Sequence, residues 1–313
     1  AFHLGDSFYL SLLKCDVVAL EQSLDSVIHR WISEDEEEKP EDKDKVYSRS
    51  TNSYLNLKDF VVNSFDKELI ERKLSAEVRE VNYLLKRGSD NDFEEDAWLD
   101  LYIYQLGKKT GKALTGVEGY EESRLLVEKS RKEPEENKEK NKKLKYYSYK
   151  MREQVAEAYR KGNLYMIDSI DKLTESEHFR EYMLYKRNAN MVRRMDSIMQ
   201  LGKALFTGVG CAHLPNQKGV LQMLVDKGYK IRPVQSIANE KSKLAQKYED
   251  MKYKHEYTTT VSEDGVITAN LPMRLTKVRN YSSYSSYLCP DLANGYYYQI
   301  EKISCNSAFS DKS

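Results

Sequence analysis

The sequence has few cysteines, and none of them are spaced as a metal-binding pair. Its four cysteines are Cys15, Cys211, Cys289 and Cys305, with no CxxC motif, which argues against a structural zinc site. Cys289 and Cys305 are close enough in sequence to form a disulfide in an oxidising compartment, so both the paired and the unpaired state stay open.

The sequence also lacks long apolar runs and an excess of charge of one sign. No apolar stretch approaches the ~20 residues that span a bilayer, so we expect no transmembrane segment. The 50 Lys and Arg residues balance 50 Asp and Glu residues, which gives no electrostatic support for nucleic acid as a partner. The first residues, AFHLGDSFYL, lack the basic and apolar segments of a signal peptide. Because the chain begins without Met and stops at SDKS, we expect it to be a truncated part of a longer polypeptide.

The apolar patterns that are present predict an α/β fold. Short buried strands are predicted around DVVAL, KALTGVEG and KALFTGVG, and helical spacing separates them. The order of strand KALFTGVG, helix KGVLQMLVDKG and strand YKIRPV indicates a parallel βαβ unit. We therefore expect a central mixed sheet that contains this unit and is flanked by many helices.

Composition divides the chain into two parts. Residues 1–250 hold the α/β pattern, interrupted by charged insertions at 33–45 and 129–143. From residue 251 the pattern changes to tyrosine-dense strands, with a hairpin predicted around EDG and a strand at GYYYQIEKIS. We interpret 251–313 as the start of a β-rich module that the chain truncates.

Polar side chains follow three of the predicted strands. Glu21 ends the first strand, Glu118 ends the second, and His213 lies just beyond the third. Ligands of open α/β sheets bind at the carboxyl ends of the strands. Two carboxylates and an imidazole at that edge have the chemistry to hold a divalent metal or to transfer protons. Small residues such as Gly210 allow a ligand to approach the backbone.

Each of these residues also has a structural interpretation. Glu21 and Glu118 could cap the helices that follow them, and a histidine after a strand is often a hydrogen-bonded capping residue. Cys211 fits a small buried residue better than a nucleophile. Arg187 lies in a predicted amphipathic helix, where an arginine usually forms a salt bridge at the surface. The other four histidines lack partners at ligand spacing.

An RN pair, Arg187 and Asn188, lies on a predicted helix, and a G-x-x-H motif with Gly210 and His213 follows the third predicted strand, in YMLYKRNANMVRRMDSIMQLGKALFTGVGCAHLPNQKGVLQMLVDKGYKIRPV. This segment resembles the signature block of the TraB/GumN family, which includes TraB, PrgY, GumN and the Tiki-like proteases. DVVALEQSLD and GKALTGVEGYEE resemble the segments that carry the family's glutamates, at Glu21 and Glu118. The resemblance covers about residues 1–236. The family's first G-x-x-H would lie upstream of Ala1.

The resemblance implies a metal-dependent hydrolase, most similar to a peptidase, whose substrate is a peptide or protein. It implies a divalent cation such as Mn²⁺ or Co²⁺, held by His213, Glu21, Glu118 and the upstream histidine. A truncated chain without that histidine could lack the bound cation. Arg187 would bind substrate with Gly210, and Arg187 and Asn188 would join the glutamates in catalysis. A bacterial envelope or extracellular location is favoured. The alternative is a non-catalytic protein of the same fold that binds or sequesters a peptide or small ligand; the sequence does not indicate the oligomeric state.

Overall fold

The structure is a computed structural model, and it describes residues 4–27, 99–132, 151–234, 243–273, 275–281 and 284–303. The described residues fall into two compact units, an α/β unit of residues 4–27 with 106–250 and a β unit of residues 99–105 with 251–303. The charged insertion at 33–45 and Cys305 lie outside the described residues. The insertion predicted at 129–143 begins inside a helix, α5 (Tyr120–Arg131), and residues 133–143 also lie outside.

The α/β unit contains a sheet of three described strands, which all run parallel in the order β2-β1-β3. The strands are β1 (Val17–Leu20), β2 (Ala113–Gly116) and β3 (Leu205–Gly208). Val18, Ala19 and Leu20 of β1 are all buried, as expected of a parallel strand covered on both faces. The register pairs Leu20 with both Gly116 and Gly208, so the three strands end level with one another. The predicted α/β class is confirmed.

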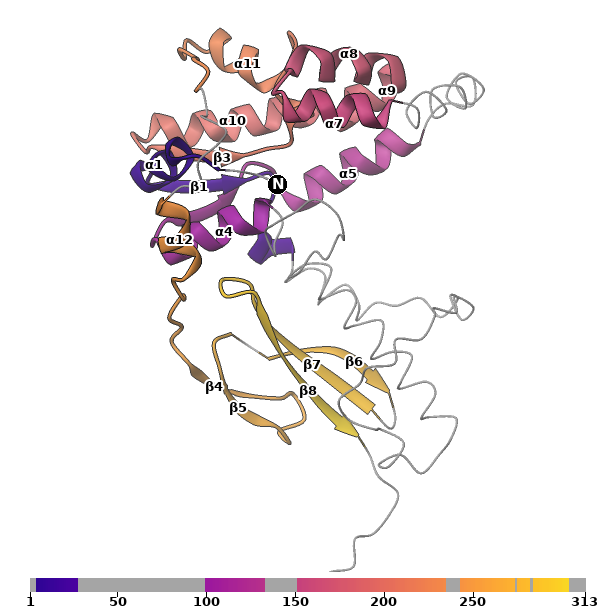
Figure 1. Cartoon of the computed structure of the whole chain (residues 1–313). Helices are drawn as coiled ribbons and strands as arrows, with labels where there is room; N and C mark the ends of the chain where they lie inside the picture. Colours follow the sequence, from indigo (N-terminus) through magenta and orange to yellow (C-terminus); the bar gives the residue numbers. More distant parts are fainter. Residues whose placement is uncertain are drawn as a thin grey trace, which may run out of the picture. The chain divides into compact units, whose positions relative to one another are not determined.

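Helices cover both faces of this sheet (Figure 1). On one face, Ala19 packs in a cluster with Met191, Val192 and Met195 of α10. On the other face, Gly107 of α4 lies so close that an added Cβ would be 3.5 Å from the Val18 Cβ. The helices in chain order are α1 (Asp6–Lys14), α4 (Leu99–Lys109), α5 (Tyr120–Arg131), α7 (Arg152–Arg160), α8 (Leu164–Thr174), α9 (Glu177–Arg180), the π-helical turn η4 (Glu181–Tyr185), α10 (Lys186–Gln200), the 3₁₀ turn η5 (Cys211–His213), α11 (Val220–Asp226) and α12 (Lys243–Glu249).

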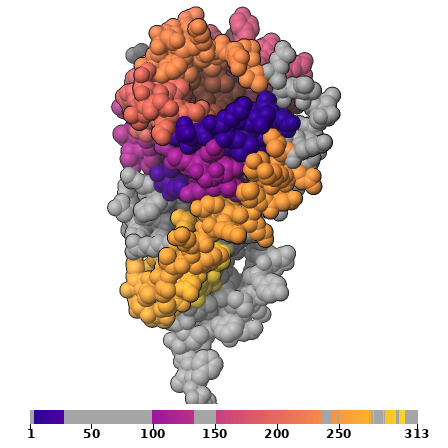
Figure 2. Space-filling model, turned by 90° about the vertical axis from the view of Figure 1, so that its left-hand side faces the viewer, coloured from indigo at the N-terminus to yellow at the C-terminus, as the bar shows by residue number. Residues whose placement is uncertain are grey.

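α1 lies along the edge strand of the sheet. The ring of Phe8 in α1 meets the ring of Phe206 in β3 edge-on, with centroids 5.3 Å apart. In Figure 2 the indigo N-terminal segment borders a hollow in the surface, with the orange segment that follows His213 on its other side. α1 therefore helps to bury the face of β3 opposite α10.

The strand predicted over 229–234 does not form. These residues follow α11 and belong to no ladder among the described strands. The side chains of Ile231 and Val234 are exposed, so pairing here would bury little apolar surface. Pro233 also has no backbone N–H to donate to a neighbouring strand.

The β unit consists of antiparallel strands. β4 (Thr258–Val261) and β5 (Thr268–Leu271) form the hairpin predicted around EDG, and Gly265 in its turn has a φ of +72°. β6 (Thr276–Tyr281), β7 (Tyr284–Asp291) and β8 (Tyr296–Ile303) form a three-stranded meander. The core of the β unit contains Leu271, Leu275, Tyr287 and Cys289. Within the described part of the chain, no helix is long and apolar enough to cross a bilayer.

Candidate active site

The level ends of the three strands place the predicted site residues at one edge of the sheet. Glu21 follows β1 directly, and Glu118 lies two residues beyond β2. The Glu118 backbone N–H donates to the Glu21 carbonyl oxygen at 2.7 Å, so pairing continues past the strands. Gly116 is required here, because a Cβ at this position would lie 2.5 Å from the Ser23 backbone nitrogen. The chain thus turns tightly around the two acids.

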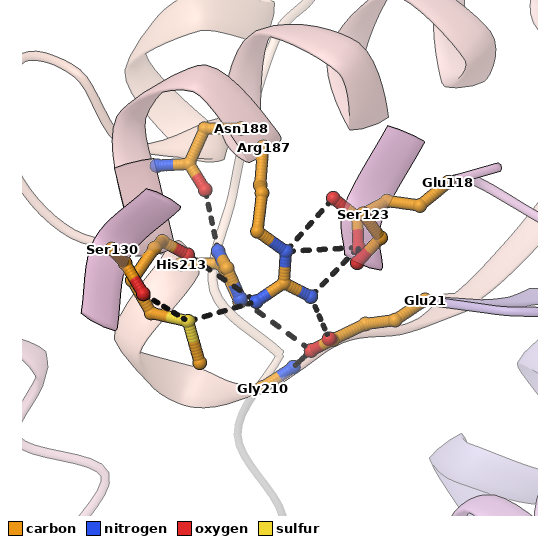
Figure 3. A network of polar contacts seen from close by, with 9 residues as sticks. Glu21, Glu118, Ser123, Ser130, Arg187, Asn188, Gly210 and His213 are labelled. Atoms are coloured by element: carbon orange, nitrogen blue, oxygen red, sulfur yellow. Dashed lines mark hydrogen bonds and ion pairs between the residues drawn. The ribbon is translucent and has the colours of Figure 1, made fainter. Parts of the chain in front are cut away.

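Arg187 lies at the centre of the cluster and uses every N–H of its guanidinium inside the protein (Figure 3). Its Nε donates to both Glu118 carboxylate oxygens at 3.0 Å. Its Nη2 donates to Glu118 Oε2 at 2.7 Å and to Glu21 Oε2 at 2.9 Å. Its Nη1 contacts the Met183 carbonyl oxygen at 3.3 Å and the Met183 sulfur at 3.8 Å. Arg187 therefore joins α10 to the ends of both β1 and β2.

Glu118 is the buried partner of this arginine, with 4% of its surface exposed. Besides the Arg187 contacts, Glu118 Oε2 accepts a hydrogen bond from the Ser123 hydroxyl at 3.1 Å. Burial alone lowers the pKa of Arg187, but the hydrogen bonds and charge of Glu118, and then of Glu21, outweigh burial and raise that pKa above its ordinary value. Arg187 therefore stays charged, and the hydrogen bonds from Arg187 and Ser123 leave Glu118 little capacity for another ligand.

His213 lies in the turn η5 and is 5% exposed. Its Nδ1 is 2.6 Å from Asn188 Oδ1, and Asn188 Nδ2 donates to the Lys218 carbonyl oxygen at 2.7 Å. That second bond fixes the orientation of the amide, so its oxygen faces the imidazole and Nδ1 carries the proton. The Nε2 atom then has its lone pair free, and it lies 3.7 Å from Glu21 Oε1.

The environment keeps His213 neutral. Burial lowers its pKa to about 4; the charge of Glu21 opposes this shift and the charge of Arg187 adds to it. A neutral imidazole with a free Nε2 lone pair, oriented by a hydrogen bond at Nδ1, is the form that binds metals.

Glu21 forms the accessible side of the cluster, because 27% of its side chain is exposed. Its Oε1 accepts a hydrogen bond from the Gly210 backbone N–H at 2.6 Å, and its Oε2 accepts one from Arg187. A Cβ on residue 210 would lie 3.0 Å from Glu21 Oε1. Glycine at this position therefore lets the carboxylate bind the backbone of the histidine turn.

These residues fit a divalent cation in part. His213 Nε2 and Glu21 Oε1 face the same point at a separation suited to two ligands of one ion, whereas both oxygens of Glu118 face Arg187. Searched over the described ranges alone, the chain has no group of three or more His, Cys, Asp or Glu side chains placed to hold a metal. The described residues thus supply two candidate ligands.

The structure brings together all six residues that the sequence singled out: Glu21, Glu118, Arg187, Asn188, Gly210 and His213. The capping interpretation does not describe Glu118, whose carboxylate bonds to Arg187 and Ser123. Cys211 is half-buried, and burial raises the pKa of its thiol. Met183 and Ser123 also belong to the network and were not among the predicted site residues. Met183 precedes Arg187 by four residues, and that spacing was a usable signal, because residues i and i+4 share one helix face.

Comparison with known proteins agrees with the resemblance read from the sequence. The family model described as the TraB/PrgY/gumN family matches residues 4–233, and the chain belongs to this family. Neither the comparison with curated proteins nor the comparison with solved structures gives a match.

Proposed function

We propose that this member of the TraB/PrgY/gumN family is a metal-dependent hydrolase that cleaves peptide bonds. The observation that carries the proposal is the His213 imidazole, which is buried and neutral and directs its Nε2 lone pair towards Glu21 Oε1 at 3.7 Å. The peptide substrate is inferred from the resemblance to the Tiki-like proteases.

His213 and Glu21 would hold a cation such as Mn²⁺ or Co²⁺ between them. When bound, such a cation lowers the pKa of a coordinated water from 15.7 towards ~7 and so supplies a nucleophile at neutral pH. Asn188 holds the His213 ring in the tautomer that leaves Nε2 free. Glu118 acts in this scheme as the counter-charge of Arg187 and is not a ligand.

Glu21 is also the group suited to accept a proton from the attacking water. An ionised carboxylate has about four acceptor sites. The Gly210 N–H and the Arg187 Nη2–H use two of them, which leaves one for a cation and one for a proton. Arg187 holds this carboxylate in place through its Nη2 hydrogen bond, so in the proposed mechanism it positions Glu21.

The test is a measurement of bound metal and of peptide cleavage on the full-length protein. His213→Ala and Glu21→Gln should each lose bound Mn²⁺ or Co²⁺ in elemental analysis, together with chelator-sensitive cleavage. His178→Ala is the matched control, because His178 is a partly exposed histidine whose Nε2 contacts the Lys129 carbonyl oxygen and whose ring lies against Tyr182. If His213→Ala retains both metal and cleavage, the proposal is wrong.

A second candidate function is binding without turnover, of a peptide or a small ligand. It is favoured by the ion pairs of Arg187 with both glutamates, because His213 and Glu21 are then the two candidate metal ligands among the described residues. The same experiment separates the two functions: a wild-type protein that binds peptide but shows no chelator-sensitive cleavage would be a binding protein.

A further inference from the structure

The segment that follows His213 contains a second anchoring point, at Asn216. Asn216 has a φ of +71°, a left-handed conformation that no other non-glycine residue in the described ranges adopts. Its Oδ1 accepts a hydrogen bond from the Lys218 backbone N–H at 2.8 Å, and its Nδ2 donates to Asp168 Oδ1 at 2.9 Å. The side chain therefore fixes the turn locally and also ties it to α8.

Asp168 belongs to a cluster of charges separate from the Arg187 site. It is buried on α8 and forms ion pairs with Arg180 Nη2 at 3.2 Å and Lys172 Nζ at 2.6 Å. Arg180 is also buried, and its Nε donates to Asp171 Oδ2 at 2.6 Å. Two acidic and two basic side chains lie together here, and these ion pairs hold Asp168 in place as an anchor for Asn216.

Contacts lead from this cluster to the active-site histidine. The guanidinium of Arg180 lies 5.1 Å from the centroid of the Tyr185 ring. The ammonium of Lys218 lies 4.5 Å from the same centroid. The Lys218 carbonyl oxygen accepts the hydrogen bond from Asn188 Nδ2. Asn188 in turn directs its Oδ1 at His213 Nδ1.

We infer that Asn216 and Asp168 are positioning residues for His213, a role that rests on the proposed function. They hold the Lys218 carbonyl oxygen where it fixes the orientation of the Asn188 amide. If that carbonyl moves, the amide is free to rotate and to present Nδ2 to the imidazole. His213 Nδ1 then becomes an acceptor, the proton moves to Nε2, and Nε2 loses the lone pair that a cation needs.

Two substitutions at residue 216 test this inference. Asn216→Gly keeps the left-handed backbone, which glycine adopts without strain, but removes the bond to Asp168. Asn216→Asp keeps an acceptor for the Lys218 N–H but places a second carboxylate against Asp168 Oδ1. Gln222→Ala is the control, because the Gln222 side chain donates to Asp226 on the same helix, α11, at an exposed position.

The first measurement is the His213 tautomer, from ¹⁵N NMR of the metal-free full-length protein at pH 7.5, with the signal assigned by comparison with His213→Gln. We expect a single Nδ1–H tautomer in the wild type and in Gln222→Ala. Both Asn216 variants should show a mixture with Nε2–H, with more Nε2–H in Asn216→Asp. If both variants retain the wild-type tautomer, the inference is wrong.

The second measurement is the affinity for Mn²⁺, which should fall about tenfold in the Asn216 variants, as for the loss of other partners that orient metal ligands. Because the tautomer is measured without metal, the proposed function and the positioning role of Asn216 can be contradicted independently of each other. A wild type that binds no Mn²⁺ while the variants still change the tautomer contradicts the proposed function and leaves the positioning role standing.

Discussion

At the scale of single residues, Arg187 makes hydrogen bonds inside the protein with all three of its guanidinium nitrogens. An arginine that binds substrate needs a free donor, and here Glu118, Glu21 and Met183 accept hydrogen bonds from all of its N–H groups. Its planar fork suits this bridging of two carboxylates, which a lysine ammonium could not reproduce. We therefore expect its main contribution to be to stability and to the position of Glu21.

Arg187→Met should be strongly destabilising. The substitution leaves Glu118 buried without its counter-charge, which costs about 3–5 kcal/mol for buried pairs of this kind. Urea denaturation of the metal-free protein measures the effect. Arg193→Met on the same helix is the control, since the Arg193 side chain is 64% exposed and its 3.5 Å pair with Glu122 should contribute at most about 1 kcal/mol. Equal losses for the two variants would contradict this role of Arg187.

His213 should make the stability of the metal-free protein depend on pH. The folded protein lowers its pKa from 6.5 to about 4, so between these values the unfolded chain binds a proton that the folded protein does not. The stabilisation is complete above pH ~6.5 and is lost as the pH falls towards 4, by about 3 kcal/mol in total.

The measurement is the free energy of unfolding from urea titrations at pH 7.5 and pH 4.5, for the wild type and His213→Gln. Other groups also titrate in this window, so the prediction concerns the difference between the two proteins. The wild type should lose more stability than the variant on acidification. Parallel pH profiles would show that His213 is not held in a lowered-pKa environment.

At the scale of elements, the candidate site could be predicted because it depends on strand ends. Parallel strands that end level bring the residues after them to one edge, and Glu21, Glu118 and His213 follow the strands closely enough for this rule to apply. The partners of these groups were less predictable. Asn188 could be singled out only through the family motif, and the anchoring of Asn216 by Asp168 depends on a turn geometry that periodicity does not encode.

The failure of the predicted strand over 229–234 has a similar cause. Alternating apolar residues indicate a strand only where burial favours pairing, and Ile231 and Val234 are exposed. Whether a sheet edge accepts such a segment depends on tertiary packing, which a local pattern cannot show.

Two glycines that precede helices, Gly219 and Gly119, should differ in how well they tolerate substitution by alanine. Gly219 precedes α11 and Gly119 precedes α5, both with ordinary negative φ. A Cβ at 219 would lie 2.5 Å from the Leu214 carbonyl oxygen and would also overlap the Pro215 carbonyl, which are backbone groups of the turn after His213. A Cβ at 119 would meet only the end of the Arg194 side chain, at 2.9 Å.

Gly219→Ala should therefore cost about 3 kcal/mol more than Gly119→Ala, because overpacking against backbone cannot be relieved by a rotamer change. Both variants replace a glycine that directly precedes a helix by alanine, so that contribution to the stability loss is the same in each. The difference between the two losses therefore measures the steric clash of the new Cβ. Thermal unfolding of the two variants measures it. Similar melting temperatures for both would mean that the turn after His213 can relax.

At the scale of the whole molecule, the two compact units have separate cores. The family model ends at residue 233, and strands β4 to β8 lie beyond it. The β unit has its own polar anchor: Asp291, 2% exposed, accepts hydrogen bonds from His255 Nε2 at 2.7 Å and from the Asn294 side chain at 2.9 Å. The sequence indicated strands here but left His255 without a partner, because Asp291 is distant from it in sequence.

Asp291→Ala should loosen the β unit selectively. The substitution removes the acceptor of half-buried donors on His255 and Asn294, at a cost of about 1–3 kcal/mol. Hydrogen exchange followed by mass spectrometry should show faster exchange in peptides from 258–303 than in the wild type, with peptides from 204–226 unchanged. Glu263→Ala, at an exposed turn position, is the control. Equal acceleration in both units would show that they unfold as one.

The π-helical turn η4 adds a constraint of a different kind. It lies directly before Arg187, where the i→i+5 bonding of a π-helix accommodates one residue more than an α-helix would. Deleting Leu184 or Tyr185 would place Met183 three positions before Arg187 instead of four, a difference of about 100° around a regular α-helix. At this turn the number of residues, and not only their chemistry, sets how Met183 is placed relative to Arg187 and so to the carboxylates of Glu21 and Glu118.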